Sequence, residues 1–388
     1  MRPFDIPPPD PRLYAVLAEA GFSDALFNPR QHRGCELVER YALHLAIDIV
    51  ARLEIDDLLA EGSTVDALLG ARRFVARFGL PLRWLLDRLA LEGLITRGPG
   101  GRYRLVTPLP APELDVLRAE GLANDPSYAP AFALLEAAGS LYPAVARGEI
   151  DAAQALFRRA ALWFAYFSNA NGYYAINNHV AAAAAAARLT AGAAVLEVGA
   201  GLGSATEALL EHPNLQEVRL ASYRVTEPVA LFRRRAERTL RAGHPEIPLS
   251  FSALDLNEPW AAQGVEAGCA ELVWGVNVFH LARDLDAVLH EAHAALVRGG
   301  WLVIGEGLRP WPEQPVGAEL PFQILPSFVD VTLDPATRAT PGFLTAEEWV
   351  AALARVGFAD RTLVPDAIRL RAIHPGFYAA GVCGRRLS

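Results

Sequence analysis

Three glycines at alternate positions, Gly199, Gly201 and Gly203, follow the apolar run Ala194 to Val198, and Glu197 stands two residues before the first of them. A helix-forming run begins directly after the glycines, so the stretch predicts a buried strand, a tight turn and a helix start. Glycine suits such a turn because the backbone takes positive φ and lets a ligand approach closely. Open α/β sheets bind ligands at the carboxyl ends of their strands. The stretch therefore predicts a nucleotide cradle.

The spacing of these glycines separates the turn from two better-known kinds. Dinucleotide-binding turns read G-x-G-x-x-G, whereas this one reads G-x-G-x-G. No Lys-Ser or Lys-Thr pair follows, which excludes a phosphate-gripping P-loop. The E-x-G-x-G-x-G form resembles motif I of the class I S-adenosyl-L-methionine (SAM)-dependent methyltransferases. A purely structural strand–turn–helix has the same outline, so the residues downstream must separate the two interpretations.

A histidine and a glutamate follow two later apolar runs that predict neighbouring strands. His280 comes after the run Ala270 to Val276, and Glu306 comes after the run Trp301 to Ile304. Histidine suits proton removal near neutral pH because its ordinary pKa is about 6.5. A carboxylate beside it can hold the tautomer and stabilise the imidazolium. The alternative is a histidine that only ends the loop after its strand.

Strand and helix patterns alternate from Ala191 onward, which predicts a parallel sheet. The predicted strand Val218 to Val225 runs into Glu227, about two dozen residues after the glycine turn, where a carboxylate can bind both hydroxyls of a ribose. A helix-start role for Glu227 fits the same position. A further predicted strand, Leu249 to Ala253, is followed by Asp255.

Three stretches resemble the C-methyltransferase domains of polyketide synthases. They are Asn277-Val-Phe-His-Leu-Ala-Arg-Asp284, Arg298-Gly-Gly-Trp-Leu-Val-Ile-Gly-Glu306 and Thr340-Pro-Gly-Phe-Leu-Thr-Ala-Glu-Glu-Trp349. Those domains use a His–Glu pair to deprotonate the carbon between two carbonyls. The resemblance therefore implies that His280 is a general base and that Glu306 orients it.

The same resemblance implies an α/β fold with a Rossmann-like, seven-stranded class I methyltransferase sheet. Runs near Arg361 to Val364 and Phe377 to Cys383 would form its final antiparallel hairpin. In that family an acidic residue in the position of Asp255 accepts a hydrogen bond from the adenine amino group. The cofactor-binding residues implied are Glu197, Gly199, Gly201, Gly203, Glu227, Asp255, Leu256 and Asn277.

The N-terminal region predicts a winged-helix module. Helical periodicity marks three segments, and a Gly98-Pro-Gly-Gly101 hairpin follows them; the segments are Glu36–Leu59, Thr64–Leu69 and Pro81–Glu92. The third segment mixes arginine with acidic and leucine residues and lacks the basic face of a DNA-reading helix. The module resembles the N-terminal part of small-molecule O-methyltransferases of secondary metabolism. That resemblance implies packing between the subunits of a homodimer or support of a substrate pocket.

Residues 111–188 are predicted to be a helical linker and substrate lid, between an arm and winged-helix domain at 1–110 and a catalytic domain at 189–388. Helices are expected at Tyr128–Leu141, Ile150–Ser168 and Tyr174–Leu189. Aromatic residues are frequent here, and apolar aromatic surface lines most substrate pockets. Core packing explains each of them as well. The substrate-contact candidates are Tyr166, Asn171, Tyr173, Tyr174 and His179, the last also a secondary base candidate.

Composition narrows the classes of function. The 388 residues are 52% hydrophobic with a net charge of −8, which argues against a nucleic-acid partner because phosphate binding needs concentrated positive charge. Three dispersed cysteines fit a reducing cytosol. The N-terminus lacks a signal-peptide pattern, and the longest apolar stretch, Val180 to Ala187, is too short for a membrane span. These features predict a cytoplasmic protein without a membrane partner.

Together these patterns predict a SAM-dependent methyltransferase that acts on a carbon or oxygen nucleophile. The acceptor would be a biosynthetic small molecule or a carrier-tethered acyl intermediate. No acidic or histidine cluster has metal spacing, so a metal-independent reaction is expected. The alternatives are an O-methyltransferase of a phenol, enol or carboxyl group, an NAD-dependent oxidoreductase, and a ligand-sensing regulator or non-catalytic methyltransferase-like protein.

Overall fold

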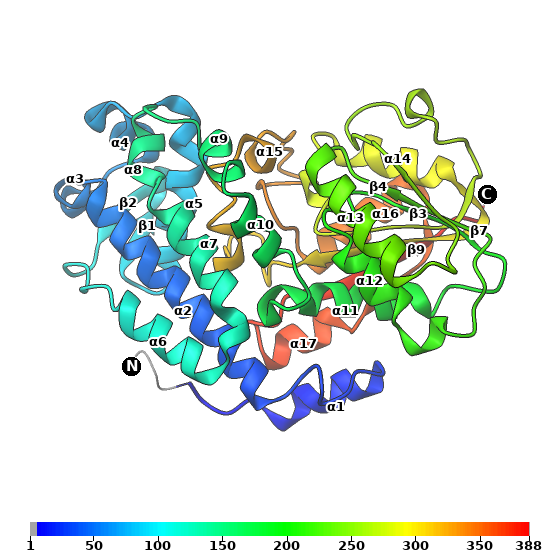
Figure 1. Ribbon diagram of the computed structural model, residues 1–388. Helices are drawn as coiled ribbons and strands as arrows, with labels where there is room; N and C mark the ends of the chain where they lie inside the picture. Colours follow the sequence, from blue (N-terminus) through cyan, green and yellow to red (C-terminus); the bar gives the residue numbers. More distant parts are fainter. Residues whose placement is uncertain (1–5, 388) are drawn as a thin grey trace. The chain divides into compact units, whose positions relative to one another are not determined.

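The computed structural model describes residues 6–387 (Figure 1). Residues 1–5 of the expected N-terminal arm and Ser388 lie outside the described residues. The described chain forms two compact units that interleave along the sequence. The first holds Asn28–Tyr166 and Trp311–Asp330, with the short stretch 6–8; the second holds Pro9–Phe27, Phe167–Pro310 and residues 331–387. Neither unit coincides with one of the three expected segments, whose boundaries stay predictions.

The first unit is mainly helical. Its elements are α2 (Pro29–Arg52), α3 (Asp56–Glu61), α4 (Val65–Arg72), η1 (Ala76–Phe78), α5 (Gly79–Leu91), β1 (Ile95–Gly98), η2 (Pro99–Gly101), β2 (Arg102–Leu105), α6 (Leu114–Asn124), η3 (Pro126–Tyr128), α7 (Ala129–Gly139), α8 (Tyr142–Ala146), α9 (Ala152–Phe157), α10 (Ala160–Tyr166), η7 (Gly317–Glu319) and α15 (Pro326–Val329). The Thr64 hydroxyl caps α4, as expected for a threonine before a helix. The expected helices Thr64–Leu69 and Pro81–Glu92 correspond to α4 and α5, and the expected hairpin is the antiparallel β1–β2 pair. The expected helix Glu36–Leu59 is divided into α2 and α3, because Glu54 between them takes a positive φ of 56°, which no α-helix allows.

Trp311–Asp330 leaves the sheet-bearing part of the chain and packs into this helical unit, which the sequence reasoning did not foresee. The Gly317 N–H donates to both carboxylate oxygens of Glu39, at 3.0 and 2.8 Å. The Trp84 indole donates to Glu319 at 3.0 Å, and the Tyr142 hydroxyl donates to the Leu320 carbonyl at 2.6 Å. The segment is therefore held by buried hydrogen bonds, and Glu319 is fully buried.

One stretch of the first unit, Pro126–Ala146, is long and apolar enough to cross a membrane by length and composition alone. In the structure it is divided into η3, α7 and α8. Apolar side chains from all three pieces, among them Tyr128, Phe132 and Tyr142, are almost fully buried in the unit. The stretch is thus an interior part of this fold.

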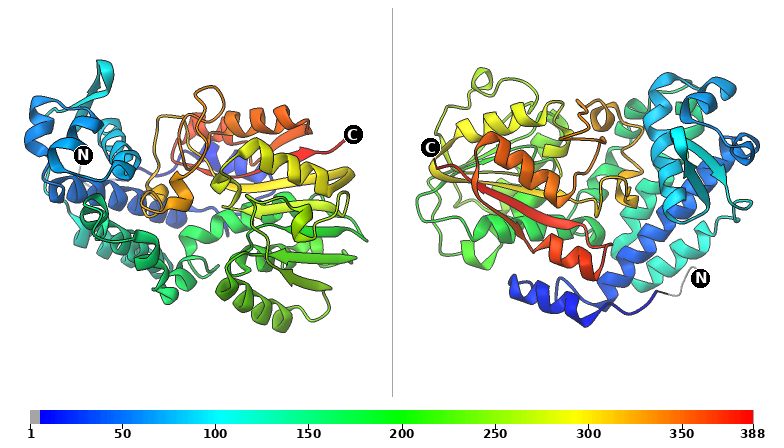
Figure 2. Two further views of the ribbon diagram at one scale, coloured as in Figure 1. Left: turned by 90° about the horizontal axis from the view of Figure 1, so that it is seen from above. Right: turned by 180° about the vertical axis from the view of Figure 1, so that it is seen from behind.

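The second unit contains a seven-stranded sheet among the described residues, in the order β5-β4-β3-β6-β7-β9-β8 (Figures 1 and 2). Its strands are β3 (Ala194–Glu197), β4 (Ser222–Thr226), β5 (Leu249–Ser252), β6 (Ala270–Val276), β7 (Leu296–Gly307), β8 (Ala359–Val364) and β9 (Ala379–Arg385). The first five are mutually parallel, whereas β9 is antiparallel to both β7 and β8. The predicted α/β class and the terminal hairpin are confirmed.

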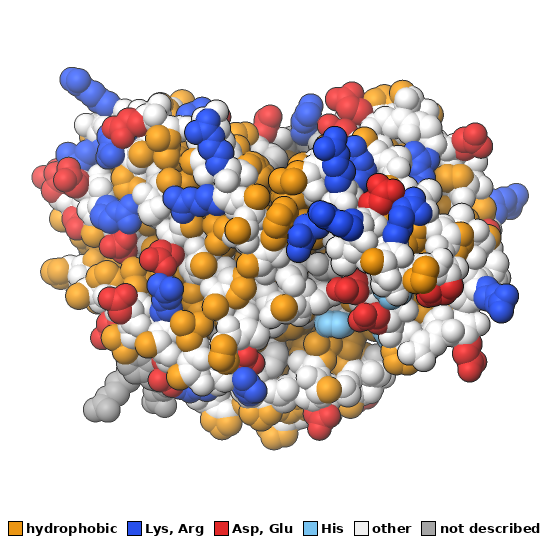
Figure 3. All heavy atoms as spheres, viewed as in Figure 1, with side chains coloured by type: hydrophobic (Ala, Val, Ile, Leu, Met, Phe, Trp, Pro, Cys, Tyr) orange, Lys and Arg blue, Asp and Glu red, His pale blue; other side chains and the backbone are white. Residues whose placement is uncertain are grey.

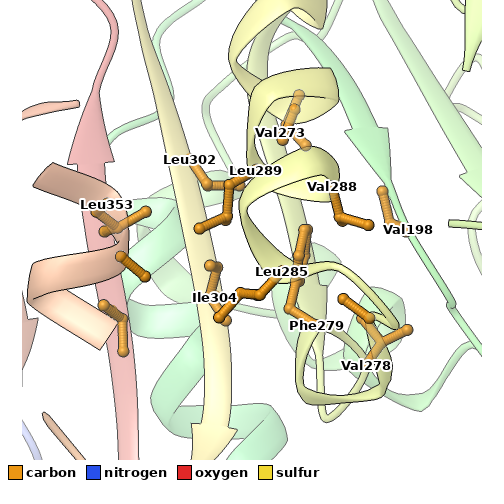
Figure 4. Close-up of a cluster of buried hydrophobic side chains, with 14 of the residues drawn as sticks. Val198, Val273, Val278, Phe279, Leu285, Val288, Leu289, Leu302, Ile304 and Leu353 are labelled. Atoms are coloured by element: carbon orange, nitrogen blue, oxygen red, sulfur yellow. The ribbon is translucent and has the colours of Figure 1, made fainter. Parts of the chain in front are cut away.

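Helices cover both faces of this sheet. They are α1 (Pro11–Glu19), α11 (Gly172–Ala186), α12 (Ser204–Leu210), α13 (Ala230–Gly243), α14 (Leu285–Ala295), α16 (Ala346–Val356) and α17 (Ala367–Ile373), with short turns η4 (Pro213–Leu215), η5 (Ala261–Gln263) and η6 (Phe279–Leu281). Side chains alternate along each strand, so Leu302 and Ile304 of β7 pack with α14 and α16, while Val303 faces the opposite core with α11 (Figure 4). A rigid, doubly covered sheet thus supports the loops at its edge.

Two predicted elements differ from the structure for local reasons. The single helix expected at Ile150–Ser168 is divided into α9 and α10, because the Trp163 indole donates to the Leu156 carbonyl at 2.9 Å and closes the end of α9. The helix of the expected surface arm, α1, buries Leu13, Val16 and Leu17, so it is an integral part of the second unit.

Acidic and basic side chains are mixed over the face drawn in Figure 3. Several basic side chains gather over the region of α13 (Figures 1 and 3), a helix with five arginines and one glutamate; the arginines are Arg233, Arg234, Arg235, Arg238 and Arg241. The expectation of no nucleic-acid partner stays a prediction.

Candidate active site

The glycine turn lies between β3 and α12, as predicted. Gly199, Gly201 and Gly203 all have positive φ, at +64°, +56° and +84°. A Cβ atom on Gly199 would lie 2.4 Å from the Val278 side chain, which excludes any larger residue there. A Cβ on Gly201 would meet no atom within 4 Å. The turn is therefore closely packed on the β6 side and open at Gly201, as a ligand cradle requires.

Glu227 lies directly after β4 and faces the glycine turn. One carboxylate oxygen accepts the Gly201 N–H at 2.9 Å, and the other accepts the Val229 N–H at 2.8 Å. Burial raises the pKa of Glu227, and the two N–H donors oppose that rise. Each oxygen keeps a second acceptor site, so the carboxylate can still bind two hydroxyl groups. The helix-start and ribose-binding interpretations are compatible in this geometry.

Glu197 is buried beneath the turn at the end of β3. One of its oxygens accepts the hydroxyls of Thr206 and Tyr223, each at 2.7 Å. Its other oxygen is buried and has no hydrogen-bond partner among the described residues. Burial raises the pKa of Glu197 to about 7, and the two hydroxyl donors oppose that rise. An unsatisfied buried acceptor beside an open glycine fits a ligand that brings a hydrogen-bond donor.

Asp255 and Leu256 follow β5 in the loop expected to contact the base. The Asp255 carboxylate accepts the Asn257 N–H at 2.9 Å, and the Asp255 N–H donates to the Gln263 side chain at 2.8 Å. Leu256 is 9% exposed. These contacts fix the loop, and the adenine-binding role of Asp255 stays a prediction.

Asn277 connects the ends of two neighbouring strands, β6 and β7. It ends β6 with a positive φ of 52°, a conformation that asparagine tolerates better than most residues. Its side-chain oxygen accepts the Gly307 N–H at 3.2 Å, and its side chain also hydrogen-bonds to Tyr174 of α11. The strained residue therefore ties the end of β6 to β7 and to the expected lid.

The structure brings His280 and Glu306 into direct contact, from η6 after β6 and from the end of β7. The two strands pair in parallel, with Val276 opposite Gly305, so both side chains emerge at the same edge. His280 Nδ1 lies 2.6 Å from one Glu306 oxygen. The other oxygen accepts the N–H groups of Val278 and His280, both at 3.2 Å. Because an ionised carboxylate can only accept hydrogen bonds, this contact requires the proton on Nδ1, and in a neutral ring Nε2 is then the unprotonated nitrogen.

Residues of the connection between β7 and α16 also contact this pair, and the sequence reasoning missed them. Phe343 packs edge-on against the His280 ring, with centroids 5.1 Å apart. Arg338 is 4% exposed and donates to the His280 and Ala282 carbonyls. The resemblance at Thr340–Trp349 pointed to this region, but nothing in the sequence identified which side chains reach the histidine.

The predicted substrate residues divide between the two units. Tyr166 lies in the first unit, where its ring packs 6.2 Å from that of Phe322. Asn171, Tyr173, Tyr174 and His179 lie in the second unit at α11. Asn171 is fully buried and caps α11 through the Tyr173 N–H, at 3.3 Å. These positions leave all the substrate roles as predictions.

The expected lid, Phe167 to Tyr174, touches the helix that follows the glycine turn. The Asn169 amide donates to the Ser204 carbonyl at 2.8 Å and to Glu207 at 3.1 Å. Burial lowers the pKa of His179, and its acidic neighbours are Glu207 of α12 and Glu211, the residue that directly follows that helix. His179 is therefore placed beside α12, whereas the Glu306 carboxylate contacts His280.

Among residues 6–387, no group of three or more His, Cys, Asp or Glu side chains is arranged to hold a metal ion. The metal-independent reaction stays a prediction.

Comparison with known proteins gives relatives that include polyketide synthases. No family model matches the sequence. The chain is 30% identical over 183 residues to the highly reducing polyketide synthase otaA of Aspergillus niger, which covers 45% of this chain and 7% of that synthase. It is 28% identical over 282 residues to the polyketide synthase ThaQ of Burkholderia thailandensis, covering 66% of this chain and 13% of that one. The chain thus spans a small part of the synthases it matches.

Solved structures match nearly the whole chain. The CurJ carbon methyltransferase aligns with a TM-score of 0.78 and 21% identity, over 97% of both chains. The fold is that of a class I methyltransferase. The DszA carbon methyltransferase follows at a TM-score of 0.74 and 23% identity, over 98% of this chain and 97% of that one. The trans-methyltransferase CalH, in complex with SAH, aligns at 0.61 and 20% identity over 92% and 91%.

These likenesses confirm the resemblance to methyltransferases of polyketide synthases, and SAM is the cofactor of enzymes with this fold. The residues present fit that group. Glu197 offers an unsatisfied buried acceptor, Glu227 has unused acceptor sites, and Gly201 leaves room above the turn. A cation with an amino group and a diol matches two carboxylates and an open backbone.

Proposed function

We propose that this chain catalyses SAM-dependent methylation of the carbon between two carbonyls in a polyketide-type acyl chain, free or tethered to a carrier. The contact between His280 and Glu306 carries the proposal, because it joins a base and its orienting carboxylate at the sheet edge where this fold binds its cofactor. The printed names of the relatives, polyketide synthases and carbon methyltransferases, support the choice of acceptor.

In this proposal His280 removes the proton from the acceptor carbon. A carbon between two carbonyls is acidic, because both carbonyls share the resulting negative charge. Nε2 takes the proton, and Glu306 then faces an imidazolium at 2.6 Å, which stabilises the charged ring. The apolar Phe343 ring beside His280 helps to exclude water from the base.

Glu227, Glu197 and the turn at Gly201 would hold the cofactor, which supplies an electrophilic methyl group on a sulfonium. The work of these residues is orientation, since an in-line displacement needs the methyl carbon aligned with the nucleophile. Tyr173 packs 6.1 Å from the ring of Tyr378, whose carbonyl accepts the N–H of Leu308 directly after β7, and it is a candidate wall of the acceptor site.

The test supplies the purified chain with ¹³C-methyl SAM and an N-acetylcysteamine thioester of a 3-oxo acid. NMR of the product is expected to show the labelled methyl group on the carbon between the carbonyls. His280→Ala is the matched control and should form little product while binding SAM normally. A labelled methoxy group would establish the O-methyltransferase alternative, and equal turnover by His280→Ala would remove the base assignment.

Two finer predictions accompany this proposal. The cytoplasm stays the predicted location, and a homodimer through the N-terminal region stays the predicted assembly. Analytical ultracentrifugation of the full chain measures the second directly, and a single species of monomer mass would contradict it.

A further inference from the structure

Two parts of the second unit hold His280: one bonds its backbone N–H and its ring, and the other bonds its backbone carbonyl. Glu306 accepts its N–H at 3.2 Å and contacts its ring at 2.6 Å. On the other side, the guanidinium of Arg338 donates through Nη2 to the His280 carbonyl and through Nη1 to the Ala282 carbonyl, the latter at 2.6 Å. The fork of Arg338 thereby closes the end of η6, whose carbonyls have no further helical turn to bond to.

Arg338 is itself placed by a tight turn. The Asp334 and Arg338 backbones exchange two hydrogen bonds, at 3.0 and 2.8 Å, and the Asp334 carboxylate accepts the Ala336 N–H at 2.7 Å. Thr332, at the start of the same segment, donates its N–H to the Arg283 carbonyl at 2.7 Å. The segment 331–338 is thus hydrogen-bonded to the loop of the histidine at three backbone carbonyls, those of residues 280, 282 and 283.

Arg338 carries a positive charge in the interior of the second unit. The side chain is 4% exposed, and its Nε has no hydrogen-bond partner among the described residues. Burial lowers the pKa of Arg338 to about 10, and the negative charges of Glu306 and Glu348 oppose that fall. The guanidinium therefore stays charged at neutral pH. It is the cation that accompanies the Glu306 carboxylate, which is 1% exposed, into the interior, where an uncompensated charge is costly.

We propose that Arg338 is a positioning residue for the base: it fixes the backbone of His280 and neutralises the buried Glu306 carboxylate. It would act through His280 and Glu306 and not on the acceptor itself. The effect of Arg338 on catalysis rests on the proposed function. Its effects on the position of His280 and on the charge around Glu306 do not depend on that function.

The charge of Arg338 should affect the protonation of the His280 ring, whereas an arginine with only a structural role would not. The charged and titratable groups around the His–Glu pair are Glu306, Arg338 with its neighbour Glu348 on α16, and Tyr174 on α11. A nearby positive charge disfavours protonation of an imidazole ring, and its removal favours it. Loss of the Arg338 charge should therefore let His280 take up its proton at a higher pH.

The decisive measurement is an NMR titration of the His280 ring in ¹⁵N-histidine-labelled full-length protein, with the signal assigned through His280→Ala. Arg338→Gln should raise the midpoint of the ring titration above that of the wild type, because a positive charge beside the pair is removed. Arg338→Lys keeps the charge and should leave the midpoint near that of the wild type. Arg298→Gln is the matched control, since it removes an exposed arginine at the opposite end of β7. An unchanged midpoint in Arg338→Gln would overturn the proposal.

Turnover gives a second, independent test. A single ammonium cannot reproduce a fork that reaches two carbonyls, so Arg338→Lys should lower kcat about tenfold with KM for SAM unchanged. A wild-type kcat in Arg338→Lys would overturn the positioning role, even if Arg338→Gln failed to fold. If the wild-type chain transfers no methyl group, the proposed function fails, and the ring titration still decides the role of Arg338.

Discussion

The edge of the sheet has two halves that use the same kind of residue differently. At β3 and β4, the carboxylates of Glu197 and Glu227 accept hydroxyl and backbone N–H donors, and acceptor sites remain. At β6 and β7, the Glu306 carboxylate accepts three hydrogen bonds, all from His280 and Val278. A carboxylate with several of its acceptor sites unused suits ligand binding, whereas one that mainly bonds a single neighbouring residue suits the orientation of that residue. The comparison predicts that the residues at β3 and β4 control the affinity for SAM. It predicts that the residues at β6 and β7 control the rate of methyl transfer.

The largest effect should come from the rate-controlling half. His280→Ala removes the base and should lower kcat by about 10²–10⁴. Affinity for SAM should stay within about twofold, because the ring contacts Glu306 and Phe343 and lies outside the cradle. Single-turnover kinetics and calorimetric titration with SAM measure the two quantities separately. If His280→Ala also lost SAM binding, the predicted separation between cofactor binding at β3 and β4 and catalysis at β6 and β7 would be wrong.

In the binding half, Glu197 should make stability depend on pH. Its folded-state pKa of about 7 exceeds its ordinary value of 4.5, because the group is buried. The folded protein therefore binds a proton that the unfolded chain has released between those pH values. The free energy of unfolding should fall as pH rises from about 4.5 to about 7, by on the order of 3 kcal/mol.

Urea denaturation across this pH range measures that slope. Glu197→Gln keeps an oxygen for the Thr206 and Tyr223 hydroxyls but cannot titrate, so its pH dependence should be flatter in this window. The same slope in the variant would mean that other groups cause it.

Glu227→Ala should weaken SAM binding by about 1–3 kcal/mol through the loss of charge-assisted hydrogen bonds. Its effect on kcat at saturating SAM should be small, in contrast to His280→Ala. Calorimetric titration with SAM and with S-adenosylhomocysteine measures the change. Unchanged binding of both would leave Glu227 with only its role at the start of α13.

The smallest expected effect comes from the open glycine. Gly201→Ala places a Cβ where no atom lies within 4 Å, so only the positive φ is unfavourable, by about 1–2 kcal/mol. Gly243→Ala is the matched control, since that glycine has equal space and no positive φ, and alanine there should stabilise the helix end slightly. Thermal denaturation of both variants should therefore show shifts of opposite sign.

The sequence identified both halves of this edge because each depends on where strands end. His280 and Glu306 follow apolar runs that form neighbouring parallel strands, and such runs can be read from residue types alone. The glycine turn is recognisable for a similar reason, since its positive φ angles restrict the residue type. Local constraints of this kind leave a visible trace in the chain.

Contacts to backbone carbonyls cannot be predicted from the residue types in the sequence. Arg338 donates to the carbonyls of residues 280 and 282 from an irregular segment 56 residues away, and any residue type presents those carbonyls. The same holds for the Tyr142 hydroxyl on the Leu320 carbonyl. The missed features are therefore long-range and carbonyl-directed, and only the folded chain reveals them.

The hydrogen bonds between Trp311–Asp330 and the helical unit limit how this chain can be cut into fragments. Because that segment belongs to the helical unit while its flanks belong to the sheet unit, the chain passes between units at 310–311 and again at 330–331, as it does at 166–167. A fragment ending at Tyr166 would leave the Trp84 indole and the Tyr142 hydroxyl without their acceptors in Glu319 and Leu320, and Glu39 without the Gly317 N–H. Neither unit is one continuous piece of the chain, so a truncation at any one of these crossings removes part of both units.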